Sequence, residues 1–114
     1  MANDIEKEYS PHEAIGYIYT MAPQYAKAKG QLAQLEAYKS SLKSIMMKKS
    51  NENTVTGQER EAYASQEYQD LCTAIGVATE EAEKLKYQLE AAKMRFQAWQ
   101  TESANNRQIE KMTL

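Results

Sequence analysis

Apolar and aromatic residues recur in alternating steps of three and four along the second half of the chain. This row, the C-terminal seam, consists of Tyr68, Leu71, Ile75, Ala78, Ala82, Leu85, Leu89, Ala92, Phe96 and Trp99. A mean spacing of about 3.5 residues is typical of helices that wind around a partner in a left-handed coiled coil. The pattern therefore predicts one long helix over about residues 58–106.

The first half of the chain repeats this pattern with one polar exception, Lys39. Its row, the N-terminal seam, consists of Met21, Tyr25, Ala28, Leu32, Leu35, Lys39, Leu42 and Met46. The pattern predicts a partner helix over about residues 24–49. Because proline removes a helical hydrogen bond, we expect Pro23 to separate this helix from a short one over about residues 11–21. The short helix would pack through Ile15, Ile18 or Tyr19.

A loop at residues 50–57 separates the two seams, because Asn, Ser, Thr and Gly gather there. Thr56 and Glu59 have the spacing of a capping box that starts the long helix. A chain folded at this loop forms an all-α antiparallel helical hairpin, in which residues whose numbers sum to about 106 face each other. We expect a single helical domain over residues 1–114, with residues 1–9 and 108–114 flexible.

In this hairpin Phe96 and Trp99 lie close to the end of any internal partner, and the last fifteen residues or so have none. Exposed aromatic residues of this size often mark an interface. We therefore expect a homodimer or a higher oligomer. In the alternative, residues 1–9 fold back, and Ile5 and Tyr9 cover Trp99.

Composition narrows the possible functions. The chain has 114 residues, of which one is Cys and one is His, so an intrachain disulfide and a four-ligand zinc site are excluded. We expect Cys72 to be a buried, small apolar residue. Without a visible nucleophile–base pair or metal set, we expect no enzymatic activity, no cofactor, no metal and no small-molecule substrate. No apolar run of about 18 residues is present, and the N-terminus resembles no signal peptide, so we expect a cytoplasmic protein.

The formal net charge of −2 hides a segregated pattern. Residues 1–23, 24–50, 51–83 and 84–114 carry −3, +5, −7 and +3. Lysine and arginine side chains in the two basic segments could neutralise nucleic-acid phosphates, and the candidates are Lys39, Lys43, Lys48, Lys49, Lys86, Lys93 and Arg107. Aromatic residues near them could stack on bases or form an interface, and these are Tyr38, Tyr87, Phe96 and Trp99. The alternative is a solvated helix flank with ordinary ion pairs.

One further likeness concerns about residues 58–107. Its motifs are Glu59-Arg60-Glu61-Ala62, Glu67-Tyr68, Ala82-Glu83-Lys84-Leu85, the segment from Ala91 to Trp99, and Ser103-Ala104-Asn105-Asn106-Arg107. In these motifs the chain resembles a class of small bacteriophage proteins from DNA replication and recombination modules. The chain has Gln100 where the class tends to have Arg. The resemblance implies no catalytic residues, and it implies functional positions at Trp99 and Arg107.

Two functions follow as expectations. The first is a phage accessory factor of replication or recombination that binds DNA, or a DNA-processing protein, in the bacterial cytoplasm. The second is a protein–protein adaptor, or an inhibitor of a host defence protein, which acts through its coiled-coil and acidic surfaces.

Overall fold

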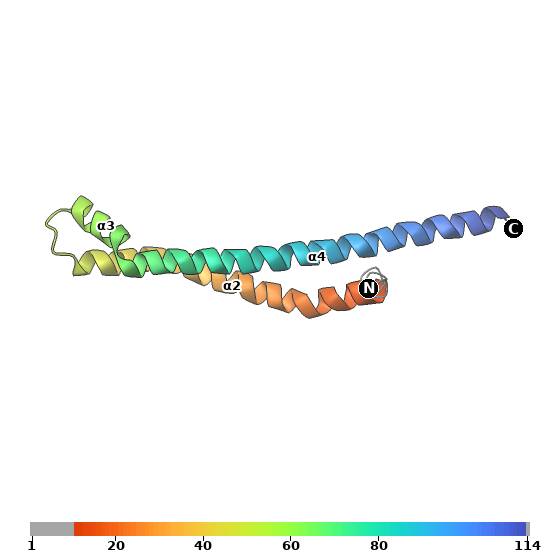
Figure 1. Ribbon diagram of the computed structural model, residues 1–114, viewed down its shortest axis with the longest axis horizontal. Coiled ribbons are helices and arrows are strands. Elements are labelled where there is room, and N and C mark those ends of the chain that lie inside the picture. Colours follow the sequence, from red (N-terminus) through yellow and green to blue (C-terminus); the bar gives the residue numbers. More distant parts are fainter. Residues whose placement is uncertain (1–10, 114) are drawn as a thin grey trace. The chain divides into compact units, whose positions relative to one another are not determined.

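The computed structural model describes residues 11–113, and three helices account for nearly all of them (Figure 1). Helix α2 spans Pro11–Lys49, α3 spans Val55–Ala64 and α4 spans Gln66–Thr113. The described residues contain no strand, so the predicted all-α class is confirmed. The chain divides into two compact units: unit 1 comprises Met1–Tyr25 and Lys84–Leu114, and unit 2 comprises Ala26–Glu83. Folding of the whole chain as a single domain stays a prediction.

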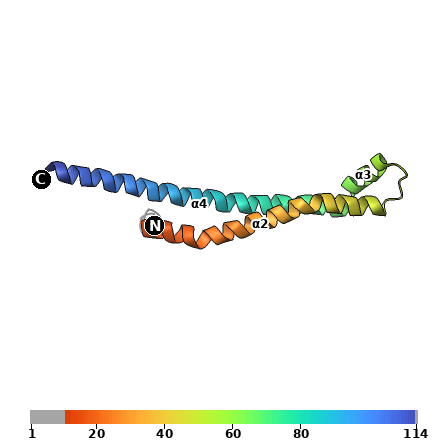
Figure 2. The ribbon, with the colours of Figure 1, turned by 180° about the vertical axis from the view of Figure 1, so that it is seen from behind.

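Within each unit a stretch of α2 lies beside a stretch of α4, as opposite views show (Figures 1 and 2). In unit 1 the Tyr17 hydroxyl donates a hydrogen bond of 2.9 Å to Gln88 Oε1. In unit 2 a contact joins α2 to α3 instead, because the Lys43 ammonium lies 5.0 Å from the centre of the Tyr63 ring of α3. The numbers in these pairs sum to 105 and 106, which agrees with the antiparallel register predicted from the sequence.

The two seams form the core of the units. In the C-terminal seam Leu71, Ala82, Leu85, Leu89 and Ala92 are buried, whereas Trp99 remains 41% exposed. The N-terminal seam buries Ala28 and Leu42 and exposes Lys39, its polar member. Burial of apolar surface along such a row is the main source of a helix pair's stability, since helix propensity alone contributes little.

The predicted interruption at Pro23 is wrong, because α2 continues through this residue. The seam explains the difference. It extends without a change of phase from Ala14 through Ile18 and Met21, while Pro23 itself points to the exposed side. A proline costs about 3 kcal/mol in a helix interior, and continuous burial on both sides of the residue outweighs this.

The packing expected of the first helical turns is partly wrong. Ile18 is half-buried as expected, but Ile15 is 48% exposed and Tyr19 is 85% exposed. Instead, Ala14 is buried and Tyr17 is half-buried. The reason is again the phase of the seam, which places positions 14 and 18 inward.

The predicted long helix is also broken, at Ser65 between α3 and α4. Ser65 adopts an extended backbone, donates a hydrogen bond of 2.6 Å from Oγ to the Ala62 carbonyl, and accepts one of 3.2 Å from the Tyr68 N–H. It therefore terminates one helix and caps the next. The C-terminal seam does not extend upstream of Tyr68, because Ala62, which is fully buried, lies out of its phase.

Both ends of the predicted long helix also differ. Thr54 caps α3 by accepting a hydrogen bond of 3.0 Å from the Gly57 N–H, so the expected capping box at Thr56 is wrong. At the other end α4 continues to Thr113, and residues 108–113 are helical where we expected a flexible end. Residues 1–9 lie outside the described residues, as do Ile5 and Tyr9 of the alternative cover for Trp99.

Cys72 is exposed, which contradicts the expected burial. It follows the buried seam residue Leu71, and one step along a helix turns a side chain away from the core. Among residues 11–113 no helix is long and apolar enough to cross a membrane.

Candidate binding surfaces

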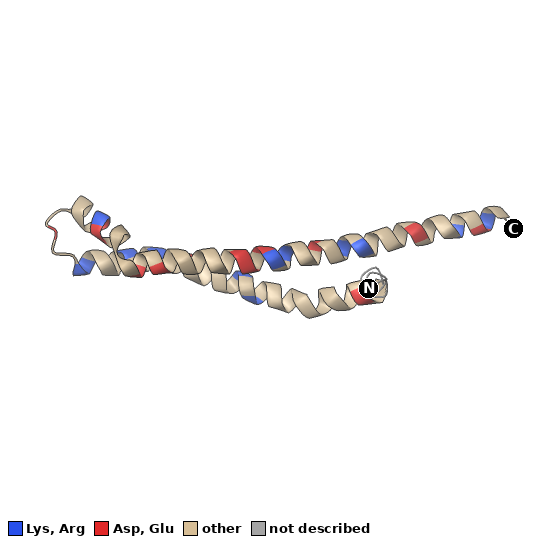
Figure 3. Ribbon diagram, in the orientation of Figure 1, with Lys and Arg blue, Asp and Glu red and all other residues tan. Residues whose placement is uncertain are grey.

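The candidate basic residues belong to both units, and each unit carries its own group. Lys86, Lys93 and Arg107 lie on α4 in unit 1, whereas unit 2 holds Lys39, Lys43, Lys48 and Lys49 on α2. Figure 3 colours all Lys and Arg positions of the described residues blue, and they are seen along both α2 and α4.

In unit 1 the three cations form one stripe along α4, which we call the basic stripe. Residues seven apart lie on the same flank of a coiled-coil helix, and Lys86, Lys93 and Arg107 are separated by seven and fourteen positions. Lys93 and Arg107 are exposed and Lys86 is half-buried. None of the three forms an ion pair with another residue among 11–113. The stripe therefore presents three cations that no described residue holds in an ion pair.

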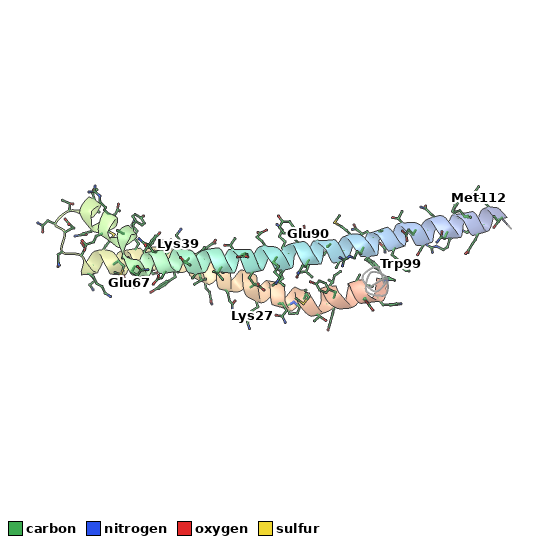
Figure 4. The ribbon with its side chains drawn as sticks, in the orientation of Figure 1. Lys27, Lys39, Glu67, Glu90, Trp99 and Met112 are labelled. Carbon is green, nitrogen blue, oxygen red and sulfur yellow. The ribbon has the colours of Figure 1, made fainter. Side chains whose placement is uncertain are left out.

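Aromatic side chains accompany the basic stripe. Tyr87 is 61% exposed, and the Lys86 ammonium lies 5.8 Å from the centre of its ring. Trp99, labelled in Figure 4, stacks on half-buried Phe96 with ring centres 5.9 Å apart and an interplanar angle of 27°. The other face of the indole remains available to a partner, because Trp99 keeps 41% of its surface exposed.

Trp99 and Arg107, the two positions implied by the resemblance, lie on one surface. They line the same shallow hollow on α4, together with Ser103 and Asn106. Trp99 also lines a second hollow, together with Arg95 and Glu102. Glu110 also lines the first hollow, so each of the two hollows at Trp99 is lined by one arginine and one glutamate. This mixture suits a polar partner that also presents a flat or apolar group.

Unit 2 brings only some of its candidates into an accessible arrangement. Lys39, Lys48 and Lys49 are exposed, and Tyr38 is 46% exposed. Lys43 is instead engaged with α3, where its Nζ lies 3.4 Å from Glu59 Oε1 and over the Tyr63 ring. Hydrogen bonding to Tyr63, followed by the charge of Glu59, raises the pKa of Lys43. We therefore assign Lys43 to the packing of α3 on α2.

Sequence reasoning missed the aromatic cluster that holds α3. Tyr63 and Tyr68 meet edge to face on either side of the Ser65 break, with ring centres 5.1 Å apart. The sequence contained a signal for this break, because the apolar period of the C-terminal seam does not continue upstream of Tyr68.

Among residues 11–113, no three His, Cys, Asp or Glu side chains gather closely enough to hold a metal ion.

Comparison of the chain with protein-family models, with curated proteins and with solved structures found no match. The bacteriophage resemblance therefore stays a prediction.

Proposed function

We propose that this protein is a non-enzymatic phage accessory factor of DNA replication or recombination that binds DNA in the host cytoplasm. The observation that supports it best is the basic stripe: Lys86, Lys93 and Arg107 share one flank of α4 without an ion pair among the described residues. These cations would neutralise DNA phosphates and so release the condensed counterions into solution. Tyr87 and Trp99 would stack on unpaired bases, which every base permits regardless of sequence.

A titration of labelled DNA tests this proposal with a matched pair of variants. Lys93→Gln/Arg107→Gln removes two exposed charges from the stripe, and Lys27→Gln/Lys84→Gln removes two exposed charges that lie outside it, on α2 and α4. We expect the first variant to weaken binding at about 50 mM salt by about tenfold, and to lower the salt slope by about 1.4 for single strands. The control should change affinity much less.

Two results would contradict DNA binding by the stripe. One is the absence of any shift at about 50 mM salt with single- and double-stranded DNA. The other is an equal loss of DNA affinity in the two variants, which would indicate that the net charge of the protein, and not the basic stripe, determines binding.

The stacked pair Phe96–Trp99 favours a second candidate function, a protein–protein adaptor or an inhibitor of a host defence protein. A half-exposed tryptophan is a frequent anchor of protein interfaces. The same surface would support the proposed homodimer or higher oligomer. Light scattering tests this, since a dimer has twice the monomer mass of 13.0 kDa, and Trp99→Ala should restore the monomer. A wild-type monomer, together with no stoichiometric partner after nuclease treatment, would exclude this candidate.

A further inference from the structure

Unit 1 contains a groove of about 330 Å³ along one flank of the α2–α4 pair. Ile18 and Ala22 of α2 and buried Leu89 of α4 supply its apolar lining. Lys86 and Lys93 line it from α4. On another side of the pair the hydrogen bond between Tyr17 and Gln88 links the two helices. On this flank α2 contributes Ile18, Ala22 and Tyr25, and the small side chain of Ala22 between the two larger residues leaves room for a third element.

The surface beside the groove is unusually apolar for an exposed helix. The stretch from Ala14 to Ala26 contains no charged residue. Ile15 lies seven residues before Ala22 and therefore on the same flank, and it is 48% exposed. Tyr19, one turn before Ala22, is 85% exposed. A stripe with this spacing is how one helix presents an apolar face to another.

The charges at the groove select the partner. Lys86 and Lys93 lie seven residues apart on one flank, and one carboxylate, Glu90, lines the groove with them. Glu90 forms no ion pair with either lysine. Lys86 is placed over the Tyr87 ring, an exposed contact that is worth only about 0.5–1 kcal/mol and that a carboxylate could replace. The rim is therefore net positive.

We propose that this groove docks an acidic amphipathic helix of a partner protein. The helix would place apolar residues at intervals of three and four over Ile18, Ala22 and Leu89, forming a three-helix arrangement in unit 1. Its acidic flank would pair with Lys86 and Lys93. Helix-in-groove recognition uses this combination of apolar anchors and flanking charge. The inference goes beyond DNA binding and does not depend on it.

Two synthetic peptides test the proposal. Both have about three heptads with leucine at the core positions; one carries glutamate on its flanks and its twin carries lysine. In fluorescence anisotropy with the full chain, we expect the acidic peptide to bind about tenfold more tightly than its twin. Lys86→Glu/Lys93→Glu should reverse this order. The matched variant Lys84→Glu/Lys111→Glu has the same net charge and should keep the wild-type order.

Exposed apolar residues provide the second arm, because their replacement leaves the core intact. Ile15→Ser and Tyr19→Ser should each weaken binding of the acidic peptide several-fold. Val77→Ser should leave it unchanged, because Val77 is 64% exposed but lies in unit 2. Circular dichroism of each variant confirms that its helices are retained.

Three outcomes would overturn the inference. The first is equal binding of the two peptides, or no reversal in Lys86→Glu/Lys93→Glu. The second is a wild-type dimer that this variant converts to a monomer, which would assign the groove to a second copy of the chain. The third is binding of an oligonucleotide but of neither peptide, which would leave DNA binding standing and remove the helix partner.

Discussion

Lys43 shows how much a single side chain depends on neighbours that periodicity does not predict. Its ammonium contacts Glu59 and Tyr63, and its pKa is raised mainly by hydrogen bonding to Tyr63. A raised pKa means that the stabilising contribution is fully present below the unfolded value, about 10.4. It is lost as the pH rises through the folded pKa. We therefore expect Lys43→Gln to destabilise the protein at about pH 8 and to lose part of this effect at about pH 11, which lies above the unfolded value.

Urea unfolding of both proteins at both pH values measures this difference. Lys27→Gln is a suitable control, because it removes an exposed lysine from the same helix. A Lys43→Gln effect that is equally large at the two pH values would contradict the assignment, because the ion pair with Glu59 and the contact over the Tyr63 ring both need a charged ammonium.

Residue burial could be predicted wherever it follows from the period of the seam. Leu85, Leu89 and Ala92 are buried as expected, and Trp99 is exposed beyond the internal partner. Cys72 was not predictable from composition, since free cysteine is usually buried, but its position beside Leu71 in the seam was sufficient to place it outside. For the candidate sites, periodicity predicted the basic stripe, while the ion pair of Lys43 depends on where α3 folds.

At the scale of elements, Ser65 carries the break between α3 and α4. Its side chain serves both helix ends, through hydrogen bonds with Ala62 and Tyr68. Loss of such a cap costs about 1 kcal/mol, so we expect Ser65→Ala to lower the free energy of unfolding by about that amount. Ser65→Asp retains an acceptor for the Tyr68 N–H and should recover most of the loss. Equal stabilities of Ser65→Ala and the wild type in urea would contradict the capping role.

Glycines inside the helices give a second prediction for elements. An added Cβ at Gly16, Gly30 or Gly76 would meet nothing within 4 Å, and alanine is about 1 kcal/mol better than glycine in a helix interior. We expect each Gly→Ala change to raise the free energy of unfolding by up to about 1 kcal/mol. Gly57→Ala is the contrast, because its Cβ would lie 3.0 Å from Thr54 Oγ1 and disturb the cap. Thermal unfolding of the four variants would show this opposite sign.

Element boundaries were harder to predict than the helices themselves. Local sequence rules predicted a helix end at Pro23, where α2 continues, and predicted none at Ser65, where α3 ends. At Pro23 the free energy gained by burying a continuous seam exceeds the local cost of one proline. At Ser65 the seam is not continuous, so a helix can end there without a strong local breaker residue. A change in seam phase is thus a better indicator of a helix boundary in this chain than a breaker residue is.

At the scale of the whole molecule, the two compact units share both long helices. Helix α2 crosses from unit 1 to unit 2 between Tyr25 and Ala26, and α4 crosses between Glu83 and Lys84. Helix formation is cooperative along a chain, because each added residue extends an existing hydrogen-bonded row. The sequence predicted a single domain, and the continuity of both helices is a physical reason to expect one unfolding transition.

Two probes can test whether the units unfold together. Trp99 is the only tryptophan and reports on unit 1, and a fluorophore on exposed Cys72 reports on unit 2. Since labelling at an exposed thiol leaves the core residues untouched, both signals can be followed in one urea titration. We expect coincident midpoints, which is the test of a two-state transition. Separate midpoints would mean that unit 1, with the basic stripe and the groove, folds independently of unit 2. A circular dichroism titration of the unlabelled chain serves as the control, because it follows the helices of both units and should give the same midpoint.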